Sequence, residues 1–96
     1  AIKAWKRHKE MTLNLVVPVG KIKFVIFDDR NKEGQFQEIT ISRDNYCRIT
    51  VPPMVWFGFK GVSKGSSILL NIANMMHNTK EVERKNIKDI EFNWEN

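Results

Sequence analysis

One histidine stands out among the side chains that could do chemistry. His8 closes a basic segment that reads Ala4-Trp-Lys-Arg-His-Lys9. If the segment is extended, Lys6 and His8 lie on the same face, because strand side chains alternate. An imidazole at the end of such a face can act as a general base near neutral pH. The alternative is a solvent-exposed histidine in a basic strand, and the residues alone favour this alternative over a general base.

The residues just before His8 suit an anionic ligand. The net charge of +5 favours an anionic partner. Trp5 could stack on a base while Lys6 and Arg7 hold phosphate. This combination fits a nucleotide-sugar and also fits single-stranded nucleic acid. A solvated basic strand remains the alternative.

The sequence gives little support to a metal site. Barrel metal sites need several histidines and a carboxylate converging on one ion. The chain has only His8 and His77, and Glu10 stands two residues after His8 in place of a second histidine. Phe57 occupies the position in the aromatic segment where a further ligand would be needed. His77 is expected to be a structural or surface residue. We therefore expect no metal and no cofactor.

The carboxylates show no spacing that specifies acid–base chemistry. Asp28 ends an apolar segment and fits a turn-capping role. The sequence has no serine nucleophile elbow, phosphate-binding loop or dinucleotide fingerprint. The other carboxylates considered are Asp29, Glu81, Glu83, Asp89 and Glu91.

Length and composition indicate one domain, residues 1–96, with a modest core. Hydrophobic residues make up 42% and charged residues 28%, as in soluble globular domains. No apolar run approaches the roughly 20 residues of a membrane helix. Cys47 is single, so no internal disulfide can form, and the cytoplasm is the expected compartment. The chain starts at Ala1 without Met, which leaves open a fragment of a longer protein.

Short apolar or alternating segments separated by turns predict an all-β architecture. Strands spaced about every ten residues are typical of an antiparallel sandwich or barrel. Pro52 and Pro53 should end one strand, because proline cannot donate to a ladder. The charged segment 81–86 fits one helical turn, and no segment has a helical period over three turns. The predicted strands are residues 3–8, 12–17, 21–28, 37–42, 46–51, 55–60, 67–73 and 89–94.

Most aromatic side chains are expected in the core, because half of each barrel strand faces inward. The candidates are Trp5, Phe24, Phe27, Trp56, Phe57, Phe59 and Trp94.

Four segments, in order, resemble the cupin-fold dTDP-4-dehydrorhamnose 3,5-epimerases and related sugar-nucleotide epimerases. Lys6-Arg-His8 falls where the family has Arg-Gly-x-His with its catalytic base. The family has a strand with the pattern Gly-x-x-x-Asp-x-x-x-Asp-x-Arg, and this chain matches it at Gly20, Asp28 and Arg30.

The two later segments complete the resemblance. Val51-Pro-Pro-Met-Val-Trp-Phe-Gly-Phe59 resembles Ile-Pro-x-Gly-x-x-His-Gly-Phe, and Ile90-Glu-Phe-Asn-Trp94 resembles Ile-x-Ile-x-Trp. The resemblance thus runs from about Ile2 to Trp94. It implies an all-β, cupin-like antiparallel β-barrel, also called a jelly roll.

The resemblance also implies a reaction without a cofactor, in surface-polysaccharide biosynthesis. A histidine removes an acidic proton at C3 or C5 of a dTDP-4-keto-6-deoxyhexose, the enolate is stabilised, and a tyrosine on the other face returns a proton. His8 is the implied catalytic base. The implied substrate-binding residues are Trp5, Lys6, Arg7, Asn14 and Trp56.

Several family positions are not matched. Phe57 replaces the histidine before Gly-Phe, and the lysine that steadies the enolate would fall near Leu13 or Asn14. The tyrosine would fall near Met75 or Met76. The aspartate behind the base would fall near Asn86 or Ile87, with Asp89 close but poorly placed. The family's N-terminal segment, which helps to bind nucleotide, has no match in this sequence.

Three hypotheses remain open at this point. The first is a sugar-nucleotide epimerase, and the second is a non-catalytic cupin that binds a nucleotide-sugar or a protein partner. The third, less favoured, is a nucleic-acid-binding barrel. We also expect a homodimer without membrane contact, because an exposed first strand would pair edge to edge in a twofold dimer.

Overall fold

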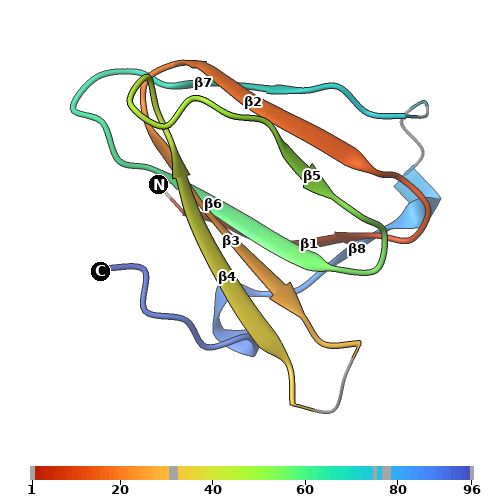
Figure 1. Cartoon of the computed structure of the whole chain (residues 1–96). Coiled ribbons are helices and arrows are strands. Elements are labelled where there is room, and N and C mark those ends of the chain that lie inside the picture. Colours follow the sequence, from red (N-terminus) through yellow and green to blue (C-terminus); the bar gives the residue numbers. More distant parts are fainter. Residues whose placement is uncertain (1, 31–32, 75, 77–78, 96) are drawn as a thin grey trace.

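Two antiparallel sheets face one another across a shared core (Figure 1). The structure is a computed structural model that describes residues 2–30, 33–74, 76 and 79–95. One sheet has the order β4-β3-β6-β1-β8 and the other β5-β2-β7. The predicted all-β, cupin-like fold is confirmed. The strands are β1 (Ile2–His8), β2 (Leu13–Val19), β3 (Ile22–Asp28), β4 (Gln35–Ile41), β5 (Ile49–Val51), β6 (Trp56–Gly61), β7 (Ile68–Asn71) and β8 (Val82–Arg84), with 3₁₀ turns η1 (Thr79–Glu81) and η2 (Ile87–Asp89).

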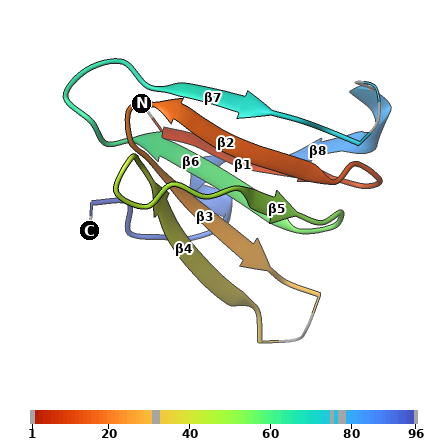
Figure 2. The same cartoon turned by 45° about the horizontal axis from the view of Figure 1, so that its top comes forward.

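The core between the sheets follows from the alternation of side chains along each strand. In β2, Leu13, Leu15 and Val17 point inward, and each is only 2% exposed. They pack in one cluster with Phe24 of β3 and Phe57 of β6. Figure 2 shows the β5-β2-β7 sheet lying over the five-stranded sheet.

A second apolar cluster covers the outer face of the five-stranded sheet. Trp5, Val25 and Trp56 pack there against Ile90 and Trp94 of the C-terminal segment. The predicted strand at residues 89–94 is wrong, because residues 90–94 belong to no strand. The alternating apolar pattern of residues 90–94 shows which of their side chains pack against the sheet. It does not show whether their backbone pairs with another strand.

The predicted helical turn at residues 81–86 is also wrong. Residues 82–84 form β8, which pairs antiparallel with Lys6–His8 of β1. The first strand therefore lies between β6 and β8 rather than at an edge. The homodimer stays a prediction, but its stated reason, an exposed first strand, is incorrect. The outermost strands of the two described sheets are β4, β8, β5 and β7.

The remaining predicted strands are found with shifted ends. β5 stops at Val51 before Pro52, as expected from a residue that cannot donate to a ladder. It starts only at Ile49, and Tyr46 is 67% exposed outside it. Among the residues that the structure describes, no helix has the length and apolar character needed to cross a bilayer.

Gly58 tests the packing between β1, β6 and the C-terminal segment. A Cβ there would lie 2.6 Å from the Ala4 Cβ and 3.1 Å from Cη2 of Trp94. We expect Gly58→Ala to lower the free energy of unfolding by about 1–3 kcal/mol, because an overpacked core must shift its backbone or rotamers. Urea unfolding measures this change. Gly65→Ala is the control, since a Cβ at Gly65 meets nothing within 4 Å. An equal loss for both variants would contradict the close packing of Gly58 against Ala4 and Trp94.

Candidate active site

His8 lies in the interior of the barrel rather than on its surface. In the pairing of β1 with its neighbours, Lys6 is opposite Phe57 and His8 is opposite Val82. This register places Lys6 and His8 on the inner face of the five-stranded sheet. The His8 ring stacks on Phe57 with centroids 6.2 Å apart, and the residue is 7% exposed. The surface histidine favoured by the residues alone is therefore wrong.

The loop after β5 holds the end of β1 in place. The Met54 N–H donates to the His8 carbonyl at 2.7 Å. Met54 has a φ of 68°, a left-handed conformation that costs a non-glycine residue free energy. The loop after Pro52 and Pro53 thus fixes the backbone that carries the imidazole.

Glu81 is the carboxylate behind His8. Its Oε2 lies 2.5 Å from Nδ1 of His8, and its Oε1 accepts the backbone N–H groups of Met11 at 2.9 Å and Glu10 at 3.2 Å. Glu81 is only 4% exposed, so both carboxylate oxygens are satisfied away from bulk water.

These contacts decide the charge of Glu81. Burial by itself raises the pKa of the Glu81 carboxyl, but hydrogen bonds from His8, Met11 and Glu10 outweigh burial and lower the pKa from its ordinary value. An ionised carboxylate only accepts hydrogen bonds. The proton between the two side chains therefore belongs to His8 Nδ1, which donates to Glu81.

The other ring nitrogen of His8, Nε2, makes no hydrogen bond to the residues that the structure describes. With Nδ1 protonated, Nε2 carries the lone pair. The hydrogen bond to Glu81 thus leaves Nε2 as the ring nitrogen that can accept a proton in this tautomer.

Asp89, which lies close to the family's aspartate position but is poorly placed for that role, acts as a cap. Asp89 accepts the Asn86 backbone N–H at 2.9 Å as part of the capping box of η2. Sequence reasoning missed Glu81 as the partner because it lies 73 residues from His8 along the chain. No local spacing signals such a pair, and it depends on β8 pairing with β1.

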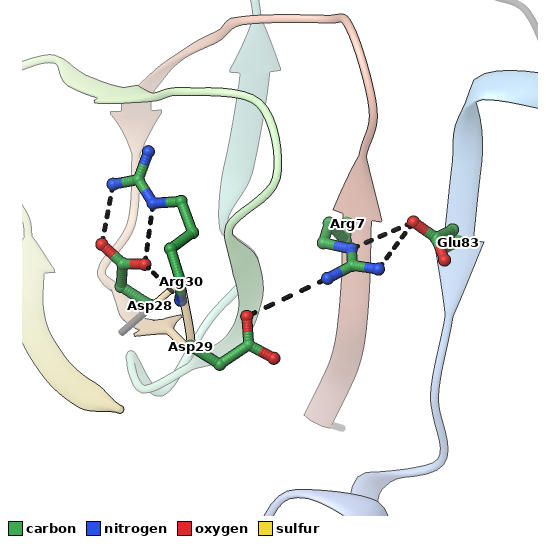
Figure 3. A network of polar contacts seen from close by, with 5 residues as sticks. All are labelled: Arg7, Asp28, Asp29, Arg30 and Glu83. Carbon is green, nitrogen blue, oxygen red and sulfur yellow. Dashed lines mark hydrogen bonds and ion pairs between the residues drawn. The ribbon is translucent and has the colours of Figure 1, made fainter. Parts of the chain in front are cut away.

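Arg7 lies on the opposite face from His8, one residue along β1. Its side chain bonds Glu83 through Nε at 3.0 Å and Nη2 at 2.8 Å, and its Nη1 lies 3.9 Å from Asp29 (Figure 3). The guanidinium also lies 4.6 Å from the centroid of the Trp56 ring. The structure therefore does not bring Arg7 and Trp56 together with His8, and their predicted contact with substrate stays a prediction.

Trp5 and Asn14 also lie apart from His8. Trp5 is 2% exposed, and its Nε1 donates to the Ile90 carbonyl at 3.2 Å. Buried in this way, the ring lacks the open face that base stacking requires. Asn14 lies between inward-facing Leu13 and Leu15, and its amide donates to the Ile72 carbonyl at 3.0 Å. Its predicted contact with substrate stays a prediction.

The side chains near the remaining family positions differ from those that the resemblance implies. Leu13 is a core residue, and Met76 is 88% exposed. Met75 and His77 lie outside the described residues. Among the residues that are described, no three His, Cys, Asp or Glu side chains gather as a metal ion would require. The absence of a metal and of a cofactor stays a prediction.

A polar cavity opens at the far end of β3. Asp28, Arg30 and Gln37 help to line its volume of about 210 Å³. Arg30 donates to Asp28 through Nε at 2.8 Å, Nη2 at 2.7 Å and the backbone N–H at 3.1 Å (Figure 3). The expected turn-capping role of Asp28 is confirmed.

Comparison with known proteins identifies similar sugar isomerases and epimerases. No protein-family model matches the chain. The probable low-salt glycan biosynthesis epimerase Agl13 of Haloferax volcanii is 29% identical over 90 residues, which are 90% of this chain and 58% of that protein. The structure of a dTDP sugar isomerase from Desulfovibrio desulfuricans G20 is 37% identical with a TM-score of 0.91, covering 98% of this chain and 64% of that chain.

A 3,4-ketoisomerase from Helicobacter canadensis is 25% identical with a TM-score of 0.73, covering 88% of this chain and 59% of that chain. The chain thus spans less than two thirds of the length of each of these relatives. They confirm the resemblance to sugar-nucleotide epimerases and isomerases as a kind of protein. They do not single out the 3,5-epimerases.

The depressed pKa of Glu81 predicts how stability changes in acid. Stability from this carboxylate is present above its ordinary pKa of 4.5 and is lost as the pH falls through its lower folded value. We expect Glu81→Gln to cost about 1–3 kcal/mol at neutral pH, because a buried charge-assisted hydrogen bond is lost. The variant's stability should then fall less steeply below pH 4.5. Urea unfolding at a series of pH values checks this, with exposed Glu91→Gln as the control. Parallel pH profiles for Glu81→Gln and the unmodified protein would contradict it.

The pKa of Asp28 offers a direct test of the cavity at the end of β3. Hydrogen bonds from the Arg30 side chain, and then from its backbone, lower the pKa of Asp28 to about 2. We expect Arg30→Gln to raise this pKa toward its ordinary value of 3.8, as seen by carbon NMR titration of the carboxyl group. Arg43→Gln should leave it unchanged. A pKa that stays near 2 in Arg30→Gln would show that the ion pair is not formed.

Proposed function

We propose that this chain carries the acid–base site of a sugar-nucleotide isomerase of the epimerase type, with His8 as the base. The observation that supports this most directly is the buried His8–Glu81 pair, in which Nε2 of His8 makes no hydrogen bond to the described residues. The similarity to a dTDP sugar isomerase and to a glycan-biosynthesis epimerase supports the class of substrate. The proposed substrate is a dTDP-4-keto-6-deoxyhexose, and the proposed reaction needs no cofactor.

The geometry provides what a general base requires. Glu81 fixes the tautomer and orientation of the ring through Nδ1, as the carboxylate does in hydrolase triads. Nε2 then takes a proton from a carbon next to the keto group, and the electrons move onto the carbonyl oxygen as an enolate. Return of a proton to the other side of that carbon inverts its configuration. If the enolate oxygen is protonated instead, an enediol forms. Loss of the proton from the neighbouring hydroxyl group and addition of a proton to the former keto carbon then move the keto group to the adjacent carbon.

Both reactions therefore begin with the same proton transfer, so one base serves either an epimerase or a ketoisomerase. The family positions that would separate the two reactions are not all matched in this chain, because the enolate-stabilising lysine would fall near Leu13 or Asn14, and Leu13 is a core residue. Lys6 is the cation that shares the inner face with His8, two residues earlier on β1. We propose Lys6 as a substrate contact on this basis.

A non-catalytic cupin that binds a nucleotide-sugar is the second candidate. It is favoured by the apolar core residue Leu13 and by exposed Met76, which lie near the positions where the family uses a lysine and a tyrosine. In that case His8 would contribute to binding or folding but would not move a proton.

Deuterium incorporation separates these candidates. Incubation with dTDP-4-keto-6-deoxyglucose in heavy water should place deuterium at C3 or C5, which mass spectrometry and proton NMR detect. We expect His8→Asn to slow incorporation by about 10²–10⁴-fold, the usual contribution of a general base. Glu81→Gln should slow it by about 10–100-fold, because the ring loses its orienting partner. Exposed Lys9→Gln is the control.

The same samples test the second candidate. Ligand binding that survives His8→Asn, together with no deuterium incorporation by the unmodified protein, would replace the isomerase proposal with the binding protein. The position of the deuterium and the identity of the product decide between epimerisation and movement of the keto group.

A further inference from the structure

A cavity of about 370 Å³ lies against the inner face of β1, and its charged lining is basic. Lys3, Lys6, Arg84 and Lys85 contribute to the lining, and among the described residues no Asp or Glu does. The Lys85 ammonium group lies on the other face of the sheet, 4.9 Å from the centroid of the Trp56 ring. The positive charges that face the cavity are therefore those of Lys3, Lys6 and Arg84.

Lys6 differs from the other lysines of this cavity in its surroundings. It lies between Phe57 of β6 and Arg84 of β8, and like charges directly opposite one another repel. Within the described part of the chain, neither Lys6 nor Arg84 forms an ion pair with a carboxylate. Lys6 is also partly buried, whereas Lys3 is exposed and lies opposite Phe59. Burial, and then the charge of Arg84, lower the pKa of Lys6 from its ordinary value.

The next pair along the same two strands shows the opposite arrangement. Arg7 is opposite Glu83, and the two side chains form a salt bridge with Nη2 and Oε1 2.8 Å apart. The outward-facing pair is therefore neutralised, whereas the pair that faces the cavity carries two positive charges. Partial burial and a neighbouring cation both favour the uncharged form of an amine, and the uncharged amine is the nucleophile.

Phe57 joins this cavity to the His8 site. It contributes to the lining of the cavity, and the His8 ring stacks on it with centroids 6.2 Å apart. Lys6 and His8 are two residues apart on the same face of β1, so their Cα atoms are separated by roughly 7 Å. A single ligand of the size of a sugar can therefore contact both the Lys6 amine and the His8 imidazole.

We infer that Lys6 is a nucleophilic amine that joins the keto carbon of the substrate as an imine, while His8 removes the proton from the neighbouring carbon. The inference rests on the proposed function for its keto-sugar substrate and adds a second catalytic residue to that site. A protonated imine withdraws electrons more strongly than a neutral carbonyl group does, so the neighbouring carbon becomes more acidic. Lys6 thus stabilises the developing negative charge through a covalent bond.

The steps balance with water and protons from the solvent alone. The uncharged Lys6 amine adds to the keto carbon, and with uptake of one proton a water molecule leaves, which gives an iminium ion. Nε2 of His8 removes the proton from the neighbouring carbon, and the electron pair moves onto the iminium nitrogen to give an enamine in place of the enolate. Return of a proton to that carbon restores the iminium ion. Water then adds, and the ketone, the Lys6 amine and one proton are released.

Trapping with sodium cyanoborohydride tests the imine, because this reagent reduces an iminium ion to a stable secondary amine. The probes are dTDP-4-keto-6-deoxyglucose and dihydroxyacetone, a small ketone that reports on the amine without the nucleotide. With each probe, intact-protein mass spectrometry should show a covalent adduct, and peptide mapping should place it on Lys6 rather than on Lys3 or Lys85. An adduct spread evenly over the lysines would overturn the inference.

The two probes keep this inference separate from the proposed function. Deuterium incorporation by the unmodified protein, with no adduct from either probe, would overturn the imine and leave the isomerase proposal in place. An adduct of dihydroxyacetone on Lys6 without deuterium incorporation would support the reactive amine and contradict the isomerase proposal.

Lys6→Arg separates an imine from a simple charge contact, because arginine keeps the positive charge but has no amine that is free to react. We expect this variant to lose the adduct and to slow deuterium incorporation by roughly tenfold or more. Exposed Lys9→Arg is the matched control and should form the adduct on Lys6 as the unmodified protein does. Thermal unfolding checks that both variants fold. Deuterium incorporation by folded Lys6→Arg at the unmodified rate would overturn the inference.

Arg84→Gln gives a reading that a merely structural role of Lys6 would not change. Removal of the opposite positive charge should raise the pKa of Lys6, while Lys3 and His8, the other titratable groups on this face of β1, remain. Adduct formation with dihydroxyacetone should therefore slow near neutral pH and recover at higher pH. Arg48→Gln removes the same charge next to β5, outside this cavity, and should leave the pH profile unchanged. An identical shift in both variants, or no shift in Arg84→Gln, would overturn the inference.

Discussion

The buried hydrogen bond between His8 and Glu81 is the interaction on which the rest of the site depends. An unpaired carboxylate at 4% exposure would carry a large desolvation cost. Here Nδ1 of His8 and two backbone N–H groups offset that cost. The pair joins the end of β1 to the turn before β8, so the same contact orders the imidazole and closes one side of the sheet.

The pairing of β1 with β8 also separates the charges of the molecule onto two faces. Along β1, Lys6 and His8 point to the inner side, while Arg7 points outward to Glu83. The outer face is further closed by the C-terminal segment, where Trp94 packs on Trp5 with centroids 5.5 Å apart. Lys6 and His8 are thereby left on the inner face, whereas apolar packing covers much of the outer face.

Much of the fold could be predicted from local patterns. Alternating apolar residues and turn residues located seven of the strands, because burial on one face of a sheet imposes a period of two. The segments at 81–86 and 89–94 were predicted wrongly for a related reason. Residues 82–84 read Val-Glu-Arg and show no apolar alternation, yet β1 supplies a hydrogen-bonding partner for them. Ile90 and Trp94 show the alternation without any ladder.

The sequence by itself determined the all-β architecture, the end of β5 at Pro52 and the candidacy of His8, since each depends on residues close together in the chain. Only the tertiary structure decided that His8 is buried, that Glu81 is its partner and that Trp5 faces the other way. These outcomes depend on which strands pair and in what register. A shift of one residue in that register exchanges the two faces of a strand, and no local pattern records it across 73 residues.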